Sequence, residues 1–148
     1  IVIPSRVTDG LLSTLRTSRL APMVVVHSNH PAELDTATGE ALRRFINAGI
    51  PVLNQAVLLK GVNDDADVLA ELSERLVNLA AMPYYLHQLD PVTGSLHFRV
   101  PVERGLEIIA ALRRRLPGYA VPRYVQEIPG EAHKSDLTGL PPELEKEN

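Results

Sequence analysis

The sequence predicts an α/β fold in which parallel strands alternate with helices. Short apolar runs rich in β-branched residues alternate with longer segments whose apolar residues recur at helical spacing. This alternation is typical of βα units built around a parallel sheet. The predicted strands are residues 1–4, 22–27, 50–59, 82–89 and 119–128. Five strands are too few to close an eight-stranded barrel, so we expect a small doubly wound sheet or part of a larger barrel. Because the chain begins inside the first predicted strand, we favour the partial barrel.

Four amphipathic segments between the strands predict helices at residues 9–20, 38–49, 63–80 and 100–116. Asp9 is the expected N-cap of the first helix and Thr38 that of the second, which ends at Gly49. The last residues, PPELEKEN, are acidic and rich in proline. We therefore expect one domain over residues 1–137, followed by a frayed acidic tail over 138–148. We also expect an exposed strand edge at the N-terminal side of the sheet.

Composition narrows the functional classes. The chain has 148 residues, of which 45% are hydrophobic and 22% charged, as in a globular domain. Mean hydropathy is −0.01, and no apolar run approaches the roughly 20 residues that span a bilayer. A net charge of −3 gives no reason to expect nucleic acid or a membrane surface as a partner. The absence of cysteine excludes disulfides, thiolate catalysis and iron–sulfur ligation by this chain, so we expect no metal ligands in it.

Polar side chains follow the predicted strands at their carboxyl ends, where parallel α/β folds bind ligands. If the strands are parallel, these side chains share one rim. They are His27, Asn29, His30, Asn54, Gln55, Tyr85, His87, Gln88, Asp90, Gln126, Glu127 and Lys134. Each alone has an ordinary explanation: a histidine at a strand end commonly caps or hydrogen-bonds, and Asp90 before Pro91 commonly starts a turn. Lys134, taken alone, is most simply a solvated lysine. Their coincidence on one rim is what favours a site.

Two alternatives stay open for individual residues on this rim. Asn54 and Gln55 lie within an apolar strand, and an unpaired buried amide costs about 1–3 kcal/mol, so backbone or ligand must meet them. His27 and His30, with Glu33 nearby, have a weak spacing for a metal site. The three arginines of LRRRL, residues 112–116, fall at a helix C-terminus, where the helix dipole favours cations.

Four spaced motifs resemble the lysine 2,3-aminomutase family of radical S-adenosylmethionine (SAM) enzymes: HSNHPAEL, NQAVLLKGVNDD, MPYYLHQLDPVTGSLHFRVP and GYAVPRYVQEIPGEAHKSDL. The resemblance covers residues 1–137 and implies the C-terminal portion of a partial (β/α) radical-SAM barrel. The sequences of the segments MPYYLHQLD and EIPGEAHK are most similar to the EpmB branch. That branch makes (R)-β-lysine for the modification of elongation factor P. The resemblance implies a cytoplasmic isomerase that acts on lysine and leaves the oligomeric state open.

The resemblance also implies roles for five residues. Lys134 would carry pyridoxal 5′-phosphate (PLP), because its distance from Glu127 matches the family's spacing between an acidic residue and the PLP lysine. Asp90 and Glu127 would hold the distal ammonium of the substrate lysine. His27 and Gln55 match positions that line the SAM site. Here PGEAHK replaces the glycine-rich segment of the family, so we expect a different loop shape.

The family's CxxxCxxC motif for a [4Fe-4S] cluster is absent from this sequence, which has no cysteine. The resemblance therefore implies that the cluster ligands lie outside this chain and that the chain alone is inactive. Two other functions remain: a free-lysine aminomutase of metabolism, and a non-catalytic α/β domain that binds a small metabolite.

Overall fold

The computed structural model describes residues 3–139 of the chain and is built around a five-stranded sheet with the order β1-β2-β3-β4-β5. The first four strands, β1 (Val24–His27), β2 (Val52–Val57), β3 (Ala81–His87) and β4 (Arg123–Gln126), are parallel. The last, β5 (Ser135–Asp136), runs antiparallel to β4. The predicted fold of parallel strands alternating with helices is confirmed, with one antiparallel strand added at the end.

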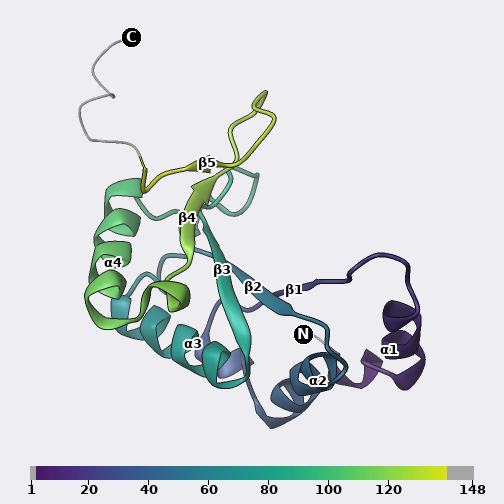
Figure 1. The fold of residues 1–148 in the computed structure, drawn as a ribbon. Coiled ribbons are helices and arrows are strands. Elements are labelled where there is room, and N and C mark those ends of the chain that lie inside the picture. Colours follow the sequence, from purple (N-terminus) through teal and green to yellow (C-terminus); the bar gives the residue numbers. More distant parts are fainter. Residues whose placement is uncertain (1–2, 140–148) are drawn as a thin grey trace.

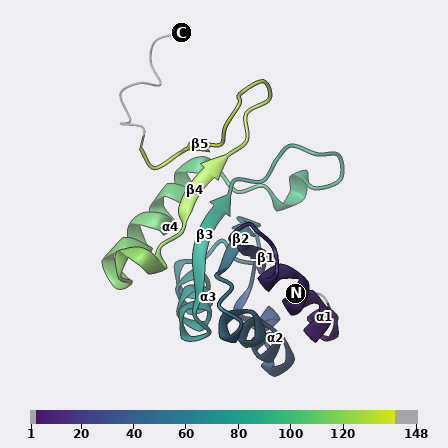
Figure 2. The same ribbon diagram turned by 45° about the vertical axis from the view of Figure 1, so that its right-hand side comes forward.

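Three helices cover one face of this sheet. In Figures 1 and 2, α2 (Thr36–Asn47), α3 (Ala66–Asn78) and α4 (Val102–Arg115) lie along the same side of the strands. α1 (Asp9–Arg16) lies beside α2, and its Asp9 pairs with Arg44 of that helix. The sheet therefore has one helix-covered face and one open face.

The core lies between the three helices and the covered face. Side chains of β2 alternate strictly, with Val52, Asn54 and Ala56 buried. Leucines, isoleucines and a phenylalanine of the helices pack against them: Leu42, Phe45, Leu69, Leu72, Leu76, Ile108, Ile109 and Leu112. On the open face, by contrast, Val25 is 45% exposed and Met82 is 39% exposed. Among residues 3–139, β1 pairs only with β2, so the expected strand edge is present.

Two predicted N-caps were wrong, by one and by three residues, because a short polar residue just upstream caps each helix. Thr8, not Asp9, caps α1 by accepting from the Leu11 amide. Asp35 caps α2 by accepting from the Thr38 amide at 2.7 Å, so Thr38 is buried inside the helix. Asp65 caps α3. Each capping residue has non-helical backbone, as an N-cap requires.

Two predicted strands also differ from the structure. Residues 1–4 do not form a strand over their described part, since Pro4–Arg6 make a 3-10 turn that the fixed φ of proline suits. The strand predicted at 119–128 is shorter, because Gly118–Ala120 form another 3-10 turn. Of the predicted tail, residues 140–148 lie outside the described range, and the amide and hydroxyl of Thr138 donate to Asp136. None of the helices formed by residues 3–139 is long and apolar enough to cross a membrane.

Candidate active site

The parallel strands bring the predicted rim residues to one edge of the sheet. His27 ends β1 and is paired in register with Gln55 of β2. His87 ends β3, Asp90 follows three residues later, and Glu127 comes directly after β4. Because carboxyl ends of parallel strands meet at the same edge, residues up to a hundred positions apart in the chain become neighbours.

A cavity of about 300 Å³ at this edge is lined by all five predicted site residues. They are His27, Gln55, Asp90, Glu127 and Lys134, and His87 joins them. The structure therefore brings these five side chains together at one edge of the sheet. Their individual roles remain predictions.

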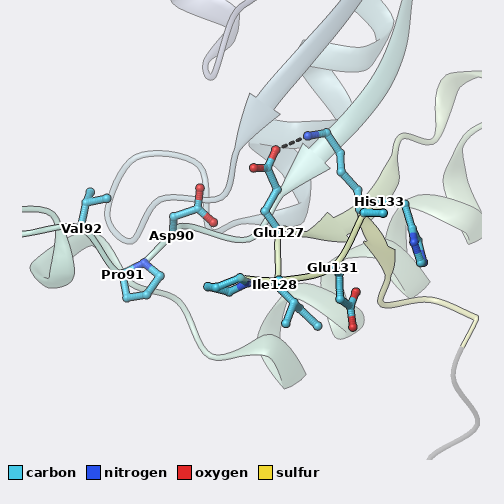
Figure 3. Close-up of a pocket in the computed structure, with 11 residues that line it drawn as sticks. Asp90, Pro91, Val92, Glu127, Ile128, Glu131 and His133 are labelled. Atoms are coloured by element: carbon cyan, nitrogen blue, oxygen red, sulfur yellow. Dashed lines mark hydrogen bonds and ion pairs between the residues drawn. The ribbon is translucent and has the colours of Figure 1, made fainter.

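A second cavity, of about 650 Å³, opens beside the first one. It lies between the start of the loop after β3 and residues 127–134, and Asp90, Glu127 and Lys134 line both cavities. Figure 3 shows the carboxylates of Asp90 and Glu127 directed to the same side of the chain, whereas Glu131 points away from them. Two carboxylates and one amine thus stand where the cavities meet.

Lys134 is not a free solvated lysine, because its ammonium donates to the Glu127 carboxylate (Figure 3). The hydrogen bond from Lys134 and its positive charge lower the pKa of Glu127 below the ordinary value of 4.5. The lysine side chain is 33% exposed and the glutamate 55% exposed, so water screens this pair. The pair therefore orients two functional groups more than it stabilises the fold.

The loop that carries Lys134 turns at Gly130 and is anchored at its C-terminal end by β5. Gly130 has a φ of 92°, a left-handed conformation that a residue with Cβ rarely adopts, and this turn starts the return toward the sheet. Immediately after Lys134, β5 pairs with β4, and the Arg123 guanidinium donates to Asp136 at 3.1 and 3.2 Å. Burial opposes ionisation of Asp136, but hydrogen bonds from Thr138 and Arg123 outweigh it and lower its pKa. Lys134 thus enters the site from an anchored strand.

Across the other half of the rim, the Gln55 amide stands between two histidines. Its Nε2 contacts Nε2 of His27, and its Oε1 lies 3.4 Å from Nε2 of His87. Burial lowers the pKa of His87, and the nearby charge of Lys134 lowers it further. His87 is therefore neutral near pH 7. A neutral His87 does not compete with a cationic ligand for the carboxylates of Asp90 and Glu127.

Three amides of the predicted rim serve the fold instead of the cavity. Asn54 points to the helix-covered side and donates to the Ser28 carbonyl at 3.1 Å, while its Oδ1 is buried without a protein partner among the described residues. Asn29 accepts from the Val57 amide at 2.8 Å. Gln88 is 3% exposed, donates to the Val100 carbonyl at 2.9 Å and accepts from the Tyr124 hydroxyl. Backbone carbonyls thus accept from the buried amide nitrogens of Asn54 and Gln88.

His30 and Glu33 close a turn and form no metal site. The His30 ring accepts from the Ala32 amide at 3.1 Å, and Glu33 accepts from the amides of Asn29 and His30 at 2.7 and 2.9 Å. Within residues 3–139 no three histidines, aspartates or glutamates are grouped as metal ligands would be.

The sequence did not reveal the buried hydrogen bond from Tyr124 to Gln88, near Asp90. Tyr124, fully buried in β4, lies against Gly105 of α4 and donates to Gln88, two residues before Asp90. In sequence, a tyrosine within an apolar strand is indistinguishable from an ordinary core residue. Only a glycine in the middle of a predicted helix signalled a close approach.

Comparison with known proteins agrees with the resemblance. The chain is 42% identical over 135 residues to L-lysine 2,3-aminomutase of Haemophilus influenzae, a match that covers 91% of this chain. The chain is homologous to part of the lysine 2,3-aminomutases. Identity is 43% over 135 residues with the Methanococcus maripaludis protein of that name and 40% over 138 residues with the Clostridium subterminale protein. These matches cover 90% and 93% of this chain.

The chain spans only part of these aminomutases: 40% of the Haemophilus protein, 31% of the Methanococcus protein and 33% of the Clostridium protein. The fold is also found in a radical SAM methyltransferase from Sphaerobacter thermophilus, with a TM-score of 0.58 and 24% identity. That likeness covers 78% of this chain and 38% of the methyltransferase. No family model matches the chain. The EpmB branch stays a prediction.

Proposed function

We propose that this chain forms part of an L-lysine 2,3-aminomutase, which converts α-lysine to (R)-β-lysine by a radical 1,2-amino shift. One observation carries the proposal beyond homology. The residues that the family resemblance assigns to PLP, substrate and SAM come from four strand ends, and they line a single cavity.

The charges of the site favour a cationic substrate. Asp90 and Glu127 direct their carboxylates to the same side, at the junction of the two cavities (Figure 3). Carboxylates bind a primary ammonium through charge-assisted hydrogen bonds, which are about twice as strong as neutral ones. The same two groups would repel an acidic side chain. We therefore assign Asp90 and Glu127 to the distal ammonium of lysine, with the domain of residues 1–137 supplying this half of the site.

The larger cavity fits PLP in part. Its volume of about 650 Å³ is within the roughly 300–1,000 Å³ of small-molecule sites, and the Lys134 amine stands on its wall. PLP supplies, when bound, the electron-delocalising group that carries the migrating nitrogen. None of the described residues lining this cavity is an arginine, so we place the phosphate contacts outside this chain. Lys134 must lose its proton and leave Glu127 before its nitrogen can attack an aldehyde.

In this proposal His27 and Gln55 would hold SAM in the smaller cavity, which also borders the residues assigned to the substrate. Proximity of this kind is what a protein contributes to cofactor-driven chemistry. The sequence has no cysteine, and the [4Fe-4S] ligands must come from elsewhere in the enzyme. We extend the proposal to a product destined for elongation factor P, on the likeness of MPYYLHQLD and EIPGEAHK to the EpmB branch.

Lysine mapping tests the role of Lys134. The sequence has only three lysines, Lys60, Lys134 and Lys146. We expect PLP followed by borohydride reduction to label Lys134 in preference to the other two, as read by mass spectrometry of peptides. Lys134→Met should abolish this selectivity, and the control Lys60→Met should leave it intact. Equal labelling of all three lysines in the folded chain would remove Lys134 from its role.

A second test concerns the chain by itself. Given reductant, SAM, PLP and lysine, we expect the 148-residue chain to form no β-lysine, because it has no cysteine to hold a cluster. β-Lysine detected by chromatography in that assay would contradict the proposed division of the site.

A further inference from the structure

Three side chains form a line of hydrogen-bonding groups across three adjacent strands. His27 of β1, Gln55 of β2 and His87 of β3 lie at the carboxyl edge of the sheet and line the same cavity. Gln55 contacts both rings, through Nε2 toward His27 and through Oε1 toward His87 at 3.4 Å, a long hydrogen bond.

An amide in this position admits only two arrangements. Its nitrogen can only donate and its oxygen can only accept, whereas each neutral imidazole has one nitrogen of each kind. In the arrangement present here, His87 donates from Nε2 to Gln55, and Gln55 donates to Nε2 of His27. The proton of a neutral His27 must then be on Nδ1. With the amide reversed, His27 would donate from Nε2 and His87 would have to accept.

We infer that His87 is a positioning residue, which orients the Gln55 amide and through it holds the proton of His27 on Nδ1. The inference rests on the proposed function only for the identity of the ligand that meets His27 and Gln55. Whatever that ligand is, the wall of the cavity offers it a fixed pattern: a His27 ring whose Nε2 lone pair is already engaged, and a Gln55 amide that can reverse only if both histidines change tautomer.

The groups around His87 are compatible with its role as the hydrogen-bond donor to Gln55. The charged and titratable groups facing it are His27 from β1, Asp90 from the loop after β3, Glu127 after β4 and Lys134 before β5. The Tyr85 ring also packs edge-on against it, with ring centroids 5.6 Å apart. Protonation of His87 would add a proton at Nδ1 and leave the Nε2 donor in place. His87 therefore donates to Gln55, and Gln55 to His27, whether His87 is neutral or protonated.

Nitrogen NMR of the histidine rings tests the inference directly, because it distinguishes the two neutral tautomers. The measurement uses the full isotopically labelled chain at about pH 8, well above the ordinary histidine pKa of about 6.5. We expect His27 to be mainly Nδ1-protonated in the wild-type chain. In His87→Phe the ratio of Nδ1-H to Nε2-H forms should fall roughly 2- to 12-fold, the bias equivalent to one net hydrogen bond.

Two further variants separate positioning from general disturbance. His87→Gln restores an N–H donor and should return the His27 ratio toward that of the wild type. His97→Phe alters a histidine that packs on Phe98, outside this cavity, and should leave the ratio unchanged. An unchanged ratio in His87→Phe, or an equal change in His97→Phe, would overturn the inference. Neither result depends on PLP labelling of Lys134, so the proposed function can fail while this inference stands.

Discussion

Gly105 in α4 is the position where a single methyl group should do most harm. A Cβ placed there would lie 2.3 Å from both Cζ and Oη of Tyr124, and 2.5 Å from its Cε1. Carbon atoms pack best at about 3.5–4.0 Å, so the ring would have to move by more than an ångström. Tyr124 is fully buried and cannot yield as a surface side chain would.

Opposing effects decide whether Gly105→Ala raises or lowers the free energy of unfolding. Alanine in place of glycine in a helix favours folding by about 0.5–1 kcal/mol. Overpacking costs about 1–3 kcal/mol. Displacing the Tyr124 hydroxyl from Gln88 leaves a buried acceptor unpaired, at about 1–3 kcal/mol. The penalties win, and we expect a loss of about 3 kcal/mol in the free energy of unfolding.

Urea unfolding followed by circular dichroism measures this loss, with Gly10→Ala as the matched control. Gly10 is also helical, in α1, but a Cβ there would meet only Thr8 Oγ1 at 3.8 Å, an ordinary contact. We expect the control to be neutral or more stable by up to about 1 kcal/mol. If Gly105→Ala proves as stable as the control, the contact with Tyr124 does not limit the fold and the reasoning is refuted.

Three further predictions concern the site and its support. Tyr124→Phe should destabilise the chain by about 1–3 kcal/mol in urea unfolding, because the buried Gln88 oxygen loses its donor; no change would mean that the hydroxyl is dispensable. In Lys134→Met, carbon NMR titration should show the pKa of Glu127 rising toward 4.5, whereas in the wild type its depressed pKa adds stability that is lost as pH falls through that folded-state value. A Glu127 pKa unaffected by the substitution would rule out the ion pair. Because the pKa of His87 lies below 6.5, the unfolded chain takes up its proton first, and stability should fall as pH drops below 6.5 toward the folded-state pKa. His87→Gln should remove that part of the pH dependence of urea unfolding, and an unaltered profile would show that His87 titrates normally.

Local pattern was sufficient to predict the order of elements and the location of the site. Strand alternation and helical spacing record which side of each element is buried, and they predicted β1, β2, β3, β4 and all four helices in order. Once the strands are parallel, their carboxyl ends must share an edge, so the gathering of His27, Gln55, Asp90, Glu127 and Lys134 was predictable without coordinates. Helix starts were less accurate, because Asp35 and Thr38 are both plausible caps and only backbone geometry separates them.

Contacts between residues distant in sequence were decided by the tertiary structure alone. The two-residue strand β5 is too short to leave a periodic pattern, and it is defined by its backbone pairing with β4, beside the contact between Arg123 and Asp136. The sequence could state that Asn54 and Gln55 need partners. It could not say that Gln88 finds Tyr124 and Val100, that Asn54 finds the Ser28 carbonyl, or that Gln55 finds two histidines. A buried polar side chain needs a hydrogen-bond partner, and this need can be recognised from the local sequence. The identity of the partner depends on which distant residues the fold brings next to it.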